Sequence, residues 1–144
     1  MSEQVFGGEH QSLRPARPLL QAMTRGFLGK CPNCGQGRLF ASWLKPVREC
    51  EHCGQEMFHH RADDLPAYLV VLIVGHVVVG AFVGVETAYT LPLGVHLAIW
   101  IPLTIALAAA LLRPVKGAVV GLQWALYMHG FGGESDAIET HPEA

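Results

Sequence analysis

Residues 65–85 read LPAYLVVLIVGHVVVGAFVGV, and after the lone Glu86, residues 87–112 read TAYTLPLGVHLAIWIPLTIALAAALL. These runs of 21 and 26 residues contain no Asp, Glu, Lys or Arg. A helix of about 20 mainly apolar residues crosses the hydrocarbon core of a bilayer. The sequence therefore predicts an α-helical two-span transmembrane hairpin over residues 65–112. Two core helices of a soluble protein are the weaker interpretation, because both runs are long and they are adjacent.

The composition of the whole chain agrees with a membrane protein. Of 144 residues, 51% are hydrophobic and 15% are charged, and the mean hydropathy is +0.30. An average soluble domain carries about 25% charged residues. This composition excludes a purely soluble globule and a large enzyme core. The first apolar run begins after 64 residues that contain no apolar core of a signal peptide, so we do not expect a cleaved leader.

The basic residues predict the orientation of the hairpin. All ten Lys and Arg lie within residues 14–61 and 113–116, and none lies in the connection between the two runs. Because Lys and Arg accumulate on the cytoplasmic side of a membrane, we expect both termini in the cytoplasm and the short turn outside.

The cysteines form two pairs with the spacing C-x2-C-x15-C-x2-C. They are Cys31, Cys34, Cys50 and Cys53. Gly35 and Gly54 follow the pairs, where a left-handed turn lets the backbone fold back toward sulfur. This spacing is typical of zinc sites, and four thiolates complete a tetrahedral shell without an open position. We therefore expect a structural zinc-ribbon-like module over residues 29–62.

Other uses of the four cysteines are less favoured. Disulfides require an oxidising compartment, which conflicts with a cytoplasmic location. Iron of the rubredoxin type and redox-active cysteines stay as alternatives to zinc. His52 lies between the cysteines of the second pair, and with four sulfurs available we expect it outside the set of ligands. A module this small would take its folding energy from the metal, with short strands between the pairs.

The segment around the first cysteine pair is basic. Residues 14–48 contain seven Lys or Arg and no acid, and residues 1–28 form a basic N-terminal segment. Within that segment four apolar residues have helical spacing, which predicts a short helix lying in the membrane interface. They are Leu19, Leu20, Met23 and Phe27. Zinc ribbons also bind nucleic acid, but basic residues beside a bilayer meet anionic headgroups first, so we favour membrane docking.

Several polar or small residues interrupt the hairpin. His76 lies near the middle of the first run, where an ionisable residue is a functional candidate. If the hairpin turns midway between them, Glu86 and His96 face each other, either as a structural pair that locks the turn or as a polar site. Gly80 and Gly84 are spaced for close helix contact.

The C-terminal part divides in two. Residues 114–131 are apolar apart from Lys116, and we interpret them as an interfacial amphipathic helix with Trp124 and Tyr127 at the membrane surface. Residues 132–144 carry four acids, and we expect an acidic disordered tail.

The ordered combination of these motifs resembles the bacterial membrane family called domain of unknown function 983, over roughly residues 24–130. The motifs are CPNCGQGRLF at 31–40, the second Cys-x-x-Cys-Gly at 50–54, RADDLPAY at 61–68, Val-Glu at 85–86, LPLGVH at 91–96 and RPVKG at 113–117. The resemblance implies that the four cysteines are the family's ribbon cysteines, and that Glu86 and His96 lie at its helix turn. Members are often encoded near assembly genes of haem–copper oxidases, which suggests a helper in the biogenesis of respiratory complexes.

The hypothesis that unites these features is a non-enzymatic, zinc-binding adaptor of the bacterial inner membrane, which spans the bilayer twice and assists assembly of a respiratory oxidase. The sequence contains no set of residues typical of a nucleophile and its base. A second hypothesis is a protein that handles metal or haem through His76, Glu86 and His96. A third is a membrane-tethered zinc ribbon that binds nucleic acid.

Overall fold

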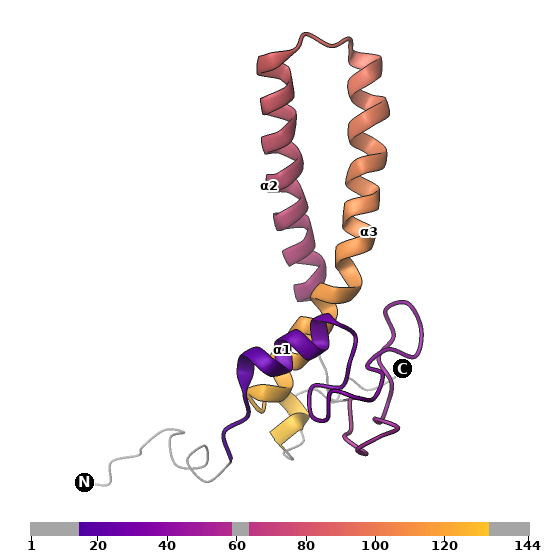
Figure 1. Cartoon of the computed structure of the whole chain (residues 1–144), viewed down its shortest axis with the longest axis vertical. Helices are drawn as coiled ribbons and strands as arrows, with labels where there is room; N and C mark the ends of the chain where they lie inside the picture. The colour runs from indigo at the N-terminus through magenta and orange to yellow at the C-terminus, as the bar shows by residue number, and fades with distance from the viewer. Residues whose placement is uncertain (1–14, 59–63, 133–144) are drawn as a thin grey trace, which may run out of the picture.

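The computed structural model describes residues 15–58 and 64–132. The helices are α1 (Leu19–Phe27), α2 (Asp64–Ala88), α3 (Leu93–Ala125) and a short 3-10 helix, η1 (His129–Gly132). Figure 1 shows two parts: a hairpin of α2 with the upper part of α3, and a lower part formed by α1, the lower part of α3, η1 and residues 28–58. We call this lower part the base. The expected tail over 132–144 lies outside the described residues, apart from Gly132.

The predicted hairpin is present, with its turn at residues 89–92. Only 11% of the most apolar window of α2, and 6% of that of α3, is buried inside the protein. Core helices of a soluble protein are mostly buried, unlike these two. Two helices this long and apolar therefore suggest a membrane protein.

The C-terminal part differs from the expectation. Residues 114–125 are not a separate helix but the last turns of α3, which continues through Pro114. A proline ring removes one hydrogen bond and crowds the preceding turn, so it bends a helix that neighbouring contacts hold together. Figure 1 shows the lower part of α3 running at an angle to the upper part. Pro114 lies between the half that packs on α2 and the half that packs on α1.

The sequence predicted that Trp124 lies at the membrane surface, and this prediction is wrong. Its side chain is 4% exposed and belongs to the hydrophobic core of the base. The reason is the bend in α3, which turns Trp124 toward α1. Whether the rest of residues 114–131 lies at a membrane surface stays a prediction.

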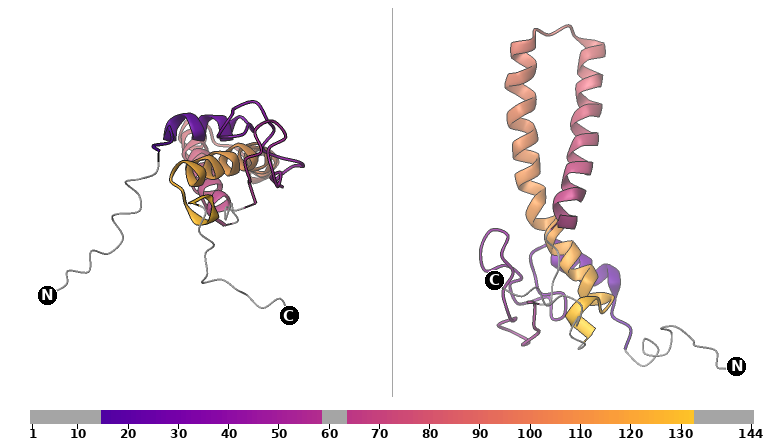
Figure 2. Two further views of the ribbon diagram at one scale, coloured as in Figure 1. Left: turned by 90° about the horizontal axis from the view of Figure 1, so that it is seen from below. Right: turned by 180° about the vertical axis from the view of Figure 1, so that it is seen from behind.

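Helix α1 crosses α3 with direct backbone contact. Ala22 and Gly26 are the buried residues of α1, and they face Gly117 and Gly121 of α3. A Cβ atom on Gly26 would overlap the carbonyl group of Gly117, and a Cβ atom on Gly117 would overlap that of Gly26. Figure 1 shows this crossing, and the view from below in Figure 2 shows the two helices side by side. Each helix thus presents two small residues four positions apart, which is what close helix packing requires.

Arg17 fastens the N-terminal end of α1 to the end of α3. Its Nη1 donates to the carbonyl oxygen of Trp124 at 2.6 Å, and its guanidinium lies over the Trp124 and Tyr127 rings at 4.2 and 3.9 Å. An arginine suits this position because the last carbonyls of a helix lack partners within it.

The predicted helix near the N-terminus is confirmed, and part of its apolar side faces outward. Leu20 is 79% exposed and Phe27 is 48% exposed, and both line a shallow groove beside Ala118 of α3. The placement of this side in a membrane interface stays a prediction.

The cysteine-containing segment shares one core with the helices. Leu39, Phe40 and Met57 are buried together with Val119 and Val120 of α3. Instead of the strands of a zinc ribbon, residues 30–56 contain isolated antiparallel bridges, one of which joins Phe40 and Pro46. This segment is therefore built onto α1 and α3 rather than standing apart as a module.

Candidate metal centre

The two cysteine pairs adopt the same backbone turn. The N–H of Gly35 donates to the carbonyl of Cys31 at 2.8 Å, and the N–H of Gly54 donates to that of Cys50 at 2.9 Å. Both glycines have a positive φ, +71° and +72°, as the sequence predicted. Side chains rarely adopt this conformation, so glycine allows each turn to bring its two sulfurs to the same side.

The turns bring all four sulfurs together. The four Sγ atoms lie within 4.8 Å of one another, and all four cysteines are free thiols rather than disulfides. Cys31 and Cys53 are 3.7 Å apart at sulfur, and Cys34 and Cys50 are 3.8 Å apart. A tetrahedron with metal–sulfur bonds of about 2.3 Å has edges of about 3.8 Å. The cluster therefore has the dimensions to bind one metal ion through four thiolates.

N–H groups surround the sulfurs. The backbone N–H groups of Gln36 and Gly37 point at the sulfur of Cys34, each at 3.5 Å, and Nδ2 of Asn33 lies 3.6 Å from that of Cys53. A Cβ atom on Gly37 would overlap the sulfur of Cys50, so glycine is required there. Sequence reasoning missed Asn33 and Gly37. The Gly-x-Gly spacing after Cys34 was the available signal for Gly37.

The thiols differ in acidity. Burial raises the pKa of Cys31, despite N–H groups that favour its thiolate, and burial also raises the pKa of Cys53. Burial opposes ionisation of Cys34 as well, yet the N–H groups of Gly37 and Gln36 lower its pKa to about 6. At about pH 7, Cys34 is therefore a thiolate without metal, whereas Cys31 and Cys53 hold their protons.

Metal binding is expected to release protons. Because only thiolates bind the ion, binding near pH 7 should release at least two protons, from Cys31 and Cys53, and the affinity should rise about a hundredfold per pH unit. Protons compete with the metal, so the sign is loss of metal as the pH falls. Zinc titrations of the full-length protein against a chelating dye, in buffers of differing pH, measure this slope. An affinity independent of pH near neutrality would contradict it.

The cluster is tied to α1 by Arg25, which sequence reasoning also missed. Its Nη1 donates to the carbonyl oxygens of Pro32 and Asn33 at 3.2 and 2.8 Å. The first turn is thus held against the helix that crosses α3. His52, by contrast, is exposed and lies outside the set of sulfurs, in agreement with the expectation.

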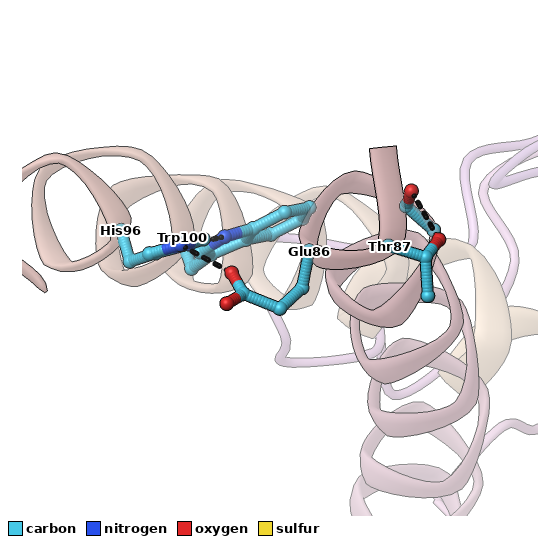
Figure 3. Close-up of polar contacts among 5 residues, drawn as sticks. Glu86, Thr87, His96 and Trp100 are labelled. Carbon is cyan, nitrogen blue, oxygen red and sulfur yellow. Dashed lines mark hydrogen bonds and ion pairs between the residues drawn. The ribbon is translucent and has the colours of Figure 1, made fainter. Parts of the chain in front are cut away.

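A second polar group lies at the far end of the hairpin, where Glu86 and His96 meet as the sequence predicted. Nε2 of His96 lies 2.8 Å from Oε2 of Glu86, as a polar contact that is not aligned as a hydrogen bond. Trp100 adds a partner that sequence reasoning missed, because its indole Nε1 donates to Nδ1 of His96 at 3.1 Å (Figure 3). The ring of Phe82 packs on both aromatic groups, with centroids 5.1 and 5.8 Å away.

The hydrogen bond from Trp100 decides which ring nitrogen of a neutral His96 carries the proton. An indole nitrogen only donates, so Nδ1 of His96 must accept and the ring proton lies on Nε2, toward the Glu86 carboxylate. Nδ1 thus accepts from Trp100, while Nε2 faces the Glu86 carboxylate without an aligned hydrogen bond. The two residues are in contact beside the turn of the hairpin, and the choice between a structural pair and a polar site stays a prediction.

The metal-handling hypothesis requires His76 to lie beside Glu86 and His96, but His76 lies away from them. It lies ten residues before Glu86 on α2, a distance of about 15 Å along a helix. Its Nδ1 is 2.7 Å from the carbonyl oxygen of Leu72 in its own helix, and its side chain is exposed. Within residues 15–58 and 64–132, the four cysteines are the one group of three or more candidate metal ligands whose ligand atoms lie close together.

Fold and site together define a class: a small protein with two candidate membrane spans and a four-cysteine cluster that could bind a metal ion. The chain belongs to the family described as protein of unknown function (DUF983), whose model matches residues 40–124, more than half of the chain. The match includes the second cysteine pair and the hairpin, and begins after the first pair. No curated protein and no solved structure matches the chain.

Proposed function

We propose that the protein is a non-enzymatic zinc-binding adaptor of the bacterial inner membrane, with the base in the cytoplasm and the hairpin docked on a partner membrane protein. The observation that carries the proposal is the closed set of four sulfurs with tetrahedral spacing. Such a shell leaves no position for a substrate, so the ion is structural. Zinc is favoured over iron because it is the usual ion of paired Cys-x-x-Cys turns and has no redox chemistry in a reducing compartment.

The metal would set the shape of the base. The sulfurs of Cys31 and Cys50 are buried in the same core as Phe40 and Val120, and Arg25 links the first turn to α1. Removing the ion would therefore change the surface that the base offers to a partner, as well as the cysteine turns themselves. An adaptor needs such a fixed surface.

The hairpin offers a docking surface of its own on α2. A shallow groove of about 560 Å³ is lined by Leu72, Gly75, His76, Gly80 and neighbouring valines. Cβ atoms on Gly75 or Gly80 would meet nothing within 4 Å, so another helix can approach closely there. A histidine exposed to lipid is costly, which favours a partner helix over this groove. Family resemblance supports a respiratory complex of the haem–copper oxidase type as the partner.

Affinity isolation from gently solubilised membranes tests the proposal. The tagged full-length protein should recover one membrane protein in stoichiometric amount. Gly80→Leu fills the groove and should lose that protein, whereas Val77→Leu, an exposed position of α2 outside the groove, should retain it. Recovery of only lipid and further copies of the chain would overturn the adaptor. Unchanged haem and copper content of the oxidase in cells lacking the gene would exclude the oxidase as the partner.

A further inference from the structure

A basic cavity lies in the base, away from the four sulfurs. It has a volume of about 770 Å³ and is bounded by residues 42–48, Phe58 and α3. Three cations line it: Lys45 and Arg48 from the cysteine-containing segment and Lys116 from α3. Among the residues that the structure describes, none that lines the cavity is acidic, and none of the three cations forms an ion pair. Three unpaired positive charges around one cavity indicate an anionic ligand.

The cavity lies at the depth of lipid headgroups if the hairpin spans a membrane. Lys116 follows Leu112, the last residue of the uncharged run, by four positions, or about 6 Å along a helix. The headgroup layer on each side of a bilayer is about 5–8 Å thick. The base directly adjoins the open end of the hairpin, as the view from behind in Figure 2 shows. Lys116, which lines the cavity, therefore lies at the height of the layer that holds the lipid phosphates.

Apart from Ser42, the rest of the described wall is apolar. Leu44, Pro46, Val47 and Phe58 line the cavity beside the cations, and the side chain of Phe58 is 52% exposed. A free inorganic anion gains nothing from such a wall. A ligand that carries both a phosphate and an acyl chain contacts both halves of the cavity.

Backbone hydrogen bonds hold the two cations of the cysteine-containing segment in place. The carbonyl of Lys45 accepts from the N–H of Ala41 at 2.9 Å, which closes a tight turn. The carbonyl of Arg48 accepts from the N–H of Met57 at 2.8 Å. The backbone that carries two of the three cations is thus held by hydrogen bonds within the folded base.

We infer that this cavity binds the phosphate of an anionic phospholipid, with the cations on the headgroup and the apolar wall on the glycerol and the first part of an acyl chain. Basic pockets beside membrane spans are suited to this class of lipid. A nucleic acid would use the cations but not the apolar wall, and at this depth it would meet the bilayer surface.

Lipid binding to the full-length protein in neutral detergent tests the inference, measured by native mass spectrometry. The protein should bind one dioctanoyl phosphatidylglycerol at least about tenfold more tightly than dioctanoyl phosphatidylcholine. Removal of each cation should weaken the affinity for phosphatidylglycerol about fivefold, which is the effect of one basic residue at an anionic membrane surface. The affinity should thus fall about a hundredfold in the triple variant Lys45→Gln/Arg48→Gln/Lys116→Gln. The single variant Lys116→Gln is a milder change.

Lys30→Gln is the matched control, because Lys30 is an exposed lysine of the same segment that does not line the cavity. It should bind like the wild type. Equal binding of both lipids, or an unchanged preference in the triple variant with its helicity intact, would overturn the inference. Displacement of the lipid by inorganic phosphate at equal concentration would assign a phosphate site instead. Equally tight binding of a DNA oligonucleotide, lost in the same variants, would assign a nucleic-acid site.

Discussion

Cys50→Ser is expected to unfold residues 31–53 while the hairpin stays inserted with the same topology. The change removes one of four thiolates, and metal binding in small cysteine sites supplies about 10–16 kcal/mol, more than most small domains have in total. Residues 31–53 have only isolated bridges and a core shared with α3 to replace that energy. The spans α2 and α3 satisfy their backbone hydrogen bonds internally and need no metal.

Limited trypsin digestion from the side of the base measures this result. The variant should be cut after Arg38 and Arg48, and it should no longer bind its partner. Both arginines are exposed, but in the folded wild type the bridge to Lys30 and the hydrogen bond from Met57 hold their backbones, so we expect slow cleavage there. His52→Ala is the control, because it alters an exposed residue beside the same cysteine pair and should keep the protection. A Cys50→Ser protein that resists trypsin at Arg38 and Arg48 and still binds its partner would show that the cysteines are not a structural metal site.

Gly117→Ala is expected to separate α1 from the lower part of α3. The added methyl group would overlap the backbone carbonyl of Gly26, and neither helix has a flexible side chain at the crossing that could move aside. Overpacked sites typically cost up to about 3 kcal/mol, and more when the backbone must shift. The base should lose this much stability, and Arg17 should lose its contact with Trp124.

Pulse proteolysis in increasing denaturant, scored by cleavage after Arg25, measures this loss. Gly84→Ala is the matched control on α2, because its Cβ atom would meet none of the described residues within 4 Å. It should leave the cleavage midpoint unchanged. Equal midpoints for Gly117→Ala and the wild type would show that the two helices do not cross in contact.

Much of the architecture follows from local patterns in the sequence. The uncharged runs at 65–85 and 87–112 predicted the hairpin because the length and polarity of a run decide whether a helix can span a bilayer. The spacing of the cysteines predicted the cluster because two residues between ligands, followed by glycine, fit one turn around one ion. Glu86 and His96 were predicted to meet because antiparallel helices place residues equally far from their turn at the same height.

The tertiary structure decided which contacts the base uses. Gly80 and Gly84 have the spacing for helix packing and make no such contact with the part of the chain that the structure describes, whereas Gly26 and Gly117, far apart in sequence, do. Trp124 has the composition of a membrane-surface residue and is buried against α1. Both outcomes depend on the direction of α3 after Pro114. Local patterns report which residues prefer a helix, lipid or a metal, but the direction of a bent helix follows from the packing of all its neighbours.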